Sequence, residues 1–208
     1  MGTCGAWLRF GGDCYTPAKW GNAMKRYSVS LLLAGLLVSA AATAEVADSG
    51  SNGFTIRTTH TIQASPQEVY RQLIGVGDWW DPQHKYSGDS HNLSIEEKPG
   101  GCFCEKLPNQ GGVRHMQVVY VDPGKTVRMI GGLGPLQSMA VTGSMTIGLS
   151  PVGTGTKLEL TYAVTGYAPG GITSLAAPVD SVLTQQFTRL KNYVEHGDPA
   201  GKTDVKAK

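Results

Sequence analysis

The longest regular pattern in the chain lies near its C-terminal end, in residues 179–197, which read VDSVLTQQFTRLKNYVEHG. Apolar side chains and one glutamine recur there at helical spacing: Val179, Val182, Leu183, Gln186, Phe187, Leu190, Tyr193 and Val194. Such a stripe predicts one continuous helix with a single buried face. The helix needs an apolar surface to cover, and the strands that precede it are the only candidate in the sequence.

Seven segments before this helix have the composition and the turn boundaries of β-strands. They are residues 54–62, 93–97, 102–107, 113–121, 126–131, 141–149 and 156–164. Pro123 and Gly124 separate two of them at the positions that a type II turn prefers. Apolar and polar residues alternate in 156–164, which predicts one buried face and one solvated face.

A short helix, or two, is expected between the first two strands. Ser65 can cap the helix, Pro66 fits its first turn, and Glu68 can close a capping box. The predicted fold is therefore α+β. It consists of a curved antiparallel sheet of about seven strands around a long C-terminal helix, with one or two short helices after the first strand.

The N-terminal region has the three parts of a secretory signal peptide. Residues 25–26 are basic, residues 29–38 are apolar, and small residues lead to a cleavage site before Glu45. The apolar run is shorter than the roughly 20 residues that a spanning helix needs. We predict a signal peptide over Met24–Ala44, a periplasmic or secreted mature protein, and no stable membrane span after cleavage.

The remaining regions follow from this division. Residues 1–23 are an extension of doubtful translation, 45–52 a linker, 53–197 the folded domain and 198–208 a disordered tail. The 208 residues include 18 Lys+Arg and 16 Asp+Glu, a net charge of +2. Removing residues 1–44 takes away four basic residues and one acidic residue and leaves a net charge of −1. A nearly neutral protein does not suggest a nucleic-acid partner.

Four short motifs accompany this order of elements. They are Asp78-Trp79-Trp80-Asp81-Pro82, Gly100-Gly101-Cys102-Phe103, Val121-Asp122-Pro123-Gly124-Lys125 and Gly155-Thr156-Lys157-Leu158. Together they resemble the START-like, or SRPBCC, helix-grip superfamily, and within it proteins similar to the heat-shock ATPase activator and the polyketide cyclases. The resemblance covers about residues 53–197. It implies a cavity between sheet and helix for a small apolar or amphipathic ligand, without a cofactor, in a fold that hosts several functions.

Aromatic, methionine and histidine side chains on the expected inner positions are the candidates for ligand binding. They are His60, Trp79, Trp80, Phe103, Tyr120, Met129, Met145, Tyr162 and Phe187. Residues of these kinds also fill ordinary cores, which is the alternative interpretation. The polar loop that holds His84 and His91, together with residues 132–136, is expected to rim the cavity mouth.

Glu105 and His115 are the candidate catalytic pair. A turn at residues 108–112 would pair Leu107 with Val113 and place Glu105 directly opposite His115. A neighbouring carboxylate favours the charged imidazole and would raise the pKa of His115. Facing the cavity, the pair could act as acid and base or hold a ligand's polar end. Facing water, it would be an ion pair that contributes little to stability.

Cys102 and Cys104 follow the predicted cleavage site and have three interpretations. Partly buried free thiols are the main expectation, because unpaired Cys is often simply buried. A disulfide is the second, in an oxidising compartment. The third is a soft-metal site with Met116, suited to Cu(I).

Two classes of function remain. The first prediction is an exported protein that encloses a small apolar molecule without transforming it, because no complete catalytic constellation is visible. The alternative is a cyclase-like or hydrolase-like enzyme that uses Glu105 and His115. Neither a Gly-x-Ser-x-Gly motif nor a phosphate-binding loop occurs in the sequence.

Overall fold

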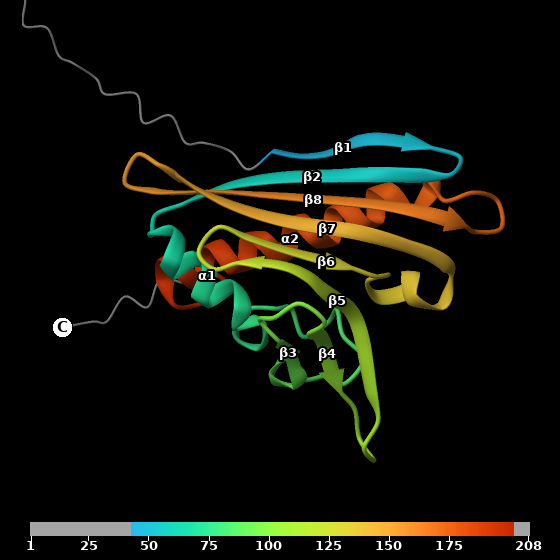
Figure 1. The fold of residues 1–208 in the computed structure, drawn as a ribbon, viewed down its shortest axis with the longest axis horizontal. Coiled ribbons are helices and arrows are strands. Elements are labelled where there is room, and N and C mark those ends of the chain that lie inside the picture. The colour runs from blue at the N-terminus through green and yellow to red at the C-terminus, as the bar shows by residue number, and fades with distance from the viewer. Residues whose placement is uncertain (1–42, 202–208) are drawn as a thin grey trace, which may run out of the picture. The chain divides into compact units, whose positions relative to one another are not determined.

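Eight antiparallel strands form one curved sheet in the computed structural model, which describes residues 43–201 (Figure 1). They are β1 (Thr43–Gly50), β2 (Gly53–Ile62), β3 (Leu93–Ile95), β4 (Cys102–Lys106), β5 (Gly112–Asp122), β6 (Thr126–Ile130), β7 (Ala140–Val152) and β8 (Gly155–Tyr167). Their order in the sheet is β1-β2-β8-β7-β6-β5-β4-β3. The α+β helix-grip prediction is confirmed. Almost all of the predicted signal peptide lies outside the described residues.

The strand that the sequence analysis did not predict is β1, whose first two residues end the predicted signal peptide and whose remaining residues lie in the segment expected as a linker. Polar and apolar residues alternate only from Thr43 to Val46, and the adjacent apolar Val46 and Ala47 break the pattern, so the usual strand signal is weak. It forms an edge of the sheet by antiparallel pairing with β2, with Val46 opposite Ile56. Val46 packs against the core. The sheet thus has eight strands where about seven were expected.

Helix α1 (Pro66–Ile74) begins as its sequence predicts. The Ser65 hydroxyl accepts a hydrogen bond from the Glu68 N–H at 3.3 Å, and Pro66 occupies the first turn. The predicted capping box is not closed, because the Glu68 carboxylate contacts Arg71 and Gln72 on the next turn instead of the Ser65 N–H. Four 3-10 helices complete the helical elements of residues 43–201: η1 (Val76–Asp78), η2 (Ser90–Asn92), η3 (Gly134–Ser138) and η4 (Thr173–Leu175).

Helix α2 (Ala176–His196) runs along one face of the sheet, as Figure 1 shows, and packs against β2 and β1. Leu183, Phe187 and Leu190 of the predicted stripe are at most 2% exposed. The Phe187 ring lies 5.8 Å from the Trp79 ring between centroids. The stripe therefore forms the contact between the helix and the rest of the core.

Strand β5 carries two bulges that change which side chains face inward. Phe103 of β4 pairs with Met116 and Cys104 pairs with Arg114, so His115 is an extra residue between them. His115 and Met116, although adjacent, are therefore both buried. The predicted register is wrong at this point, because Glu105 pairs with Val113 and not with His115.

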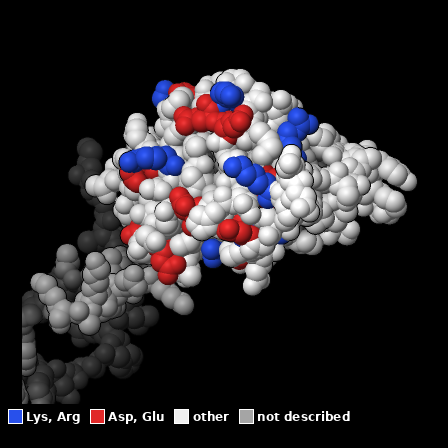
Figure 2. All heavy atoms as spheres, turned by 90° about the horizontal axis from the view of Figure 1, so that it is seen from below, with Lys and Arg blue, Asp and Glu red and all other residues white. Residues whose placement is uncertain are grey.

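The surface has a mixed charge. On the face shown in Figure 2, acidic and basic side chains are interspersed among uncharged residues. Within the part of the chain that the structure describes, no helix is both long enough and apolar enough to cross a membrane.

Candidate functional site

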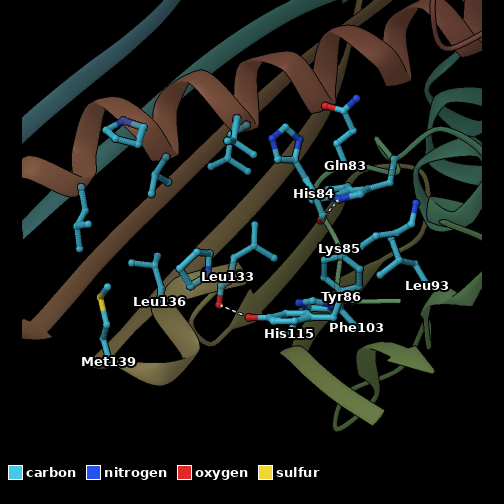
Figure 3. Close-up of a pocket in the computed structure, with 18 residues that line it drawn as sticks. Gln83, His84, Lys85, Tyr86, Leu93, Phe103, His115, Leu133, Leu136 and Met139 are labelled. Carbon is cyan, nitrogen blue, oxygen red and sulfur yellow. Dashed lines mark hydrogen bonds between the residues drawn. The ribbon is translucent and has the colours of Figure 1, made fainter. Parts of the chain in front are cut away.

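A cavity of about 380 Å³ lies between the first half of α2 and two loops (Figure 3). One loop, residues 80–86, follows η1, and the other, residues 133–139, contains η3. Leu93 and Phe103 on strands β3 and β4, and His115 on β5, complete the wall. The volume is within the range of pockets that hold small organic molecules, about 300–1,000 Å³.

The predicted ligand-binding residues either line the cavity, are buried in the core outside its lining, or, in one case, are exposed to solvent. Trp80 and Phe103 line the cavity, together with His115. Five others, namely Trp79, Met129, Met145, Tyr162 and Phe187, are buried in the core around it without lining it. His60 is also buried outside the lining, where its Nε2 lies 3.1 Å from the Thr58 hydroxyl.

Tyr120 does not face the cavity, and its predicted placement is wrong. The second bulge of β5 leaves Val119 unpaired between Val118 and Tyr120, so the alternation of inner and outer positions changes. Tyr120 is 45% exposed, and the Arg128 guanidinium lies 5.5 Å from the centre of its ring.

Glu105 and His115 form a buried pair despite the changed register. The bulge turns the imidazole so that Nε2 lies 3.0 Å from Oε2 of Glu105. The Glu105 side chain lies behind His115 and also accepts hydrogen bonds from the N–H groups of Tyr86 and Ser87. It therefore joins β4, β5 and the loop at one point.

These contacts set the protonation of the pair. Burial alone would raise the pKa of Glu105, but hydrogen bonds from Ser87, Tyr86 and His115 outweigh it and lower that pKa. Burial lowers the pKa of His115, with Glu105 acting in the opposite direction. The expected raised pKa of His115 is therefore corrected to a lowered one, because loss of hydration has the larger effect. With both pKa values lowered, the carboxylate is ionised and the imidazole neutral at neutral pH.

The loop at residues 80–86 is held against α2 by a buried amide. Gln186 is fully buried, its Oε1 accepts the Asp81 N–H at 2.8 Å, and its Nε2 lies 2.9 Å from Nδ1 of His84. Arg189 donates to the Trp79 carbonyl at 2.9 Å. Gln186, in the apolar stripe of α2, and Arg189, beside that stripe, therefore position this wall of the cavity.

Tyr162 holds the second loop. Its hydroxyl donates to the Gly131 carbonyl at 3.0 Å and accepts the Leu133 N–H at 3.2 Å. Burial raises the pKa of Tyr162 to about 12, so the hydroxyl keeps its proton. Gly143 makes room for this ring, because a Cβ there would lie 2.5 Å from it. Tyr162 thus shapes the cavity from outside its lining.

Gln83, Lys85 and Tyr86 are among the cavity-lining residues that sequence reasoning did not single out. Burial lowers the pKa of Lys85, although Asp89, Glu105 and Asp81 act in the opposite direction. The Tyr86 ring stacks on His115 at 6.0 Å between centroids, and its hydroxyl donates to the Gly134 carbonyl (Figure 3). The sequence offered only the expectation that this loop and residues 132–136 rim the cavity.

Cys102 and Cys104 form a disulfide in the structure, with their Cα atoms 5.3 Å apart. This outcome replaces the expectation of free thiols. It also removes the soft-metal alternative, because the sulfurs are bonded to each other and Met116 lies opposite Phe103. Among the described residues, no group of three or more His, Cys, Asp or Glu side chains could hold a metal ion.

A curved antiparallel sheet that grips a long C-terminal helix, with an apolar cavity between them, defines a START-like protein. Residues 53–195 match the family described as polyketide cyclase / dehydrase and lipid transport, so the chain belongs to that family. The sequence matches none of the curated proteins significantly.

Three solved structures illustrate the fold. The Aha1 dimer from Colwellia psychrerythraea has a TM-score of 0.50 at 21% identity, covering 69% of this chain and 97% of that one. A conserved protein of unknown function from Enterococcus faecalis has a TM-score of 0.53 at 17% identity, covering 80% and 82%. DynU16, from the dynemicin biosynthetic locus, has a TM-score of 0.50 at 19% identity, covering 70% of this chain and 49% of its own.

Proposed function

We propose that the protein binds a small apolar or amphipathic molecule in the cavity between α2 and the loops 80–86 and 133–139. The observation that carries this proposal is the cavity itself, which is enclosed by apolar side chains such as Leu93, Leu136 and Leu183. Burying apolar surface drives such binding at about 25 cal/mol per Å². Few polar groups line the cavity, as expected of a site that encloses its ligand.

A second candidate is an enzyme of the cyclase or hydrolase type. It is favoured by the buried imidazole of His115, which could accept a proton from a bound substrate. Glu105 would then orient His115 without transferring a proton, because hydrogen bonds from Tyr86, Ser87 and His115 stabilise its ionised form.

We also propose that the protein acts outside the cytoplasm. The signal-peptide pattern supports export, and the Cys102–Cys104 disulfide suits an oxidising compartment. The intact mass of the exported protein should correspond to residues 45–208. Recovery of residues 1–44 on that protein would contradict cleavage before Glu45.

Native mass spectrometry of protein purified from its own host tests the binding function. We expect a retained small molecule in the wild type. Val182→Trp should displace it, because Val182 lines the cavity. Ser181→Trp, which places the same bulk on the exposed neighbouring position of α2, should retain it. Equal retention by both variants would place the ligand elsewhere.

A further inference from the structure

The two ring nitrogens of His115 have different surroundings. Nε2 is bonded to the Glu105 carboxylate, whereas Nδ1 is buried and has no hydrogen-bond partner. Since an ionised carboxylate can only accept, Nε2 carries the proton of the neutral ring. Nδ1 therefore presents an unused lone pair. The residue that bears it is 4% exposed and lines the cavity.

We propose that the cavity selects ligands with a neutral hydroxyl group, an alcohol or a phenol, which donates a hydrogen bond to Nδ1 of His115. This inference rests on the proposed binding function and specifies the chemical class of its ligand. An apolar body would fill the volume lined by the leucines, and the hydroxyl would satisfy the one acceptor that the fold leaves unpaired on His115.

The charges around the cavity favour a neutral donor over an anion. The ionised Glu105 lies directly behind the imidazole, and its charge repels a second carboxylate. Lys85 is the cation in the cavity lining; its Nζ is buried without a hydrogen-bond partner, and burial lowers its pKa although the carboxylates of Asp89, Glu105 and Asp81 act in the opposite direction. A ligand carboxylate would also have no proton to give to Nδ1.

Two aromatic rings flank His115. Phe103, at 5.2 Å between centroids, is 3% exposed and fixed in the core. Tyr86, at 6.0 Å, is 54% exposed, and its hydroxyl donates to the Gly134 carbonyl at 3.1 Å. Tyr86 is therefore the more exposed of the two rings, and its hydroxyl connects the loop at residues 80–86 to the loop at residues 133–139.

Three probes with one skeleton test the inference at neutral pH: naphthalene, 2-naphthol and 2-naphthoate. Dissociation constants are measured by NMR titration of the oxidised protein. We expect 2-naphthol to bind about tenfold more tightly than naphthalene, the effect of one buried hydrogen bond. We expect 2-naphthoate to bind more weakly than either. Tighter binding of 2-naphthoate, or equal binding of 2-naphthol and naphthalene, would overturn the inference and leave the binding function intact.

Two variants test whether His115 causes the preference for 2-naphthol over naphthalene. His115→Leu should bind naphthalene as the wild type does and lose the preference for 2-naphthol. His60→Leu removes a buried histidine that does not line the cavity and should keep that preference. In the wild type, the ¹⁵N resonance of His115 Nδ1 should move upfield with 2-naphthol and not with naphthalene. An unmoved resonance overturns the inference even where His115→Leu does not fold. Failure of all three probes to bind overturns the binding function and this inference with it.

Discussion

Nε2 of His115 lies 3.0 Å from Oε2 of Glu105 although the two residues are not paired in the β4–β5 ladder. The contact depends on the extra residue in β5, which turns the imidazole toward a carboxylate that pairs with Val113. Glu105 also accepts two N–H groups from the loop that forms the cavity wall. Loop and strands are therefore coupled through one charge.

Replacing Glu105 by Gln should loosen this junction. The amide keeps the shape of the side chain but removes its charge. Its NH₂ group would also face the N–H groups of Tyr86 and Ser87, which are themselves donors. We expect a loss of about 2 kcal/mol in the free energy of unfolding, the range for hydrogen bonds to charged groups. The pKa of His115 should fall further, because Glu105 opposes its lowering. Urea unfolding and NMR titration measure both, with the exposed Glu159→Gln as control. An unchanged pKa of His115 would mean that the pair does not form.

Tyr86→Phe should make the cavity easier to enter. The change removes only the hydrogen bond to the Gly134 carbonyl, and an exposed hydrogen bond contributes about 1 kcal/mol. We expect the association rate of 2-naphthol in stopped-flow experiments to rise severalfold, with little change in unfolding. Tyr167→Phe, at a ring that is 71% exposed, is the matched control. Identical rates in both variants would rule out movement of Tyr86 as the entry step.

His60 should make the protein sensitive to acid. Burial, with a smaller effect from the Lys191 charge, lowers the pKa of His60 to about 4. Between pH 6.5 and about 4 the unfolded chain binds a proton that the folded protein does not, so stability falls as the pH falls. Below about pH 4, the lowered pKa of His60 has reduced the free energy of unfolding by about 3 kcal/mol relative to its value above pH 6.5.

Urea unfolding at several pH values of wild type and His60→Gln measures this contribution. The slope should be smaller in the variant but not absent, because the pKa of His115 is also lowered. Parallel curves for the two proteins would show that His60 does not titrate in this way.

Phe187→Ala should be among the most destabilising substitutions in α2. The side chain is 2% exposed and its ring lies 5.8 Å from that of Trp79. Loss of transfer energy and the resulting cavity predict a cost of about 3–5 kcal/mol in urea unfolding. Ser181→Ala, on the exposed face of the same helix, should change stability by less than about 0.5 kcal/mol. Similar costs at both positions would contradict the assigned face.

The disulfide should be detectable but contribute little to global stability. Intact mass should rise by two hydrogens on reduction. A link between Cys102 and Cys104 closes a loop of only three residues. Chain entropy then predicts about 1.5 kcal/mol of stabilisation, which the double variant Cys102→Ser/Cys104→Ser would lose. A loss of several kcal/mol would indicate a larger structural role.

The sequence was sufficient for the architecture because its signals were local. The spacing of residues 179–194 predicted α2, Ser65 and Pro66 predicted the start of α1, and turn residues separated seven of the eight strands. Strand β1 was missed because an edge strand can form by backbone pairing without an alternating pattern.

The candidate site was predictable only in part. A bulge leaves no mark in the amino-acid composition. Both faces of residues 113–121 are also similarly apolar, so the alternation along the strand could not show whether His115 or Tyr120 faces the cavity or the solvent. The residues of the polar loop, Lys85 and Tyr86, reach the cavity because Glu105 and Gln186 bind the loop from distant parts of the chain. Tertiary hydrogen bonds of this kind have no periodic signature.

The extra residue in β5 also determines which mutations could change the cavity's chemistry. Substitutions at His115 alter one side chain at a time and leave the strand register intact. Deleting a single residue here would restore regular alternation and move either the imidazole or the Met116 thioether to the outer face. A lineage could thus exchange a cavity with the His115 acceptor for one without it in a single genetic event, without passing through intermediates.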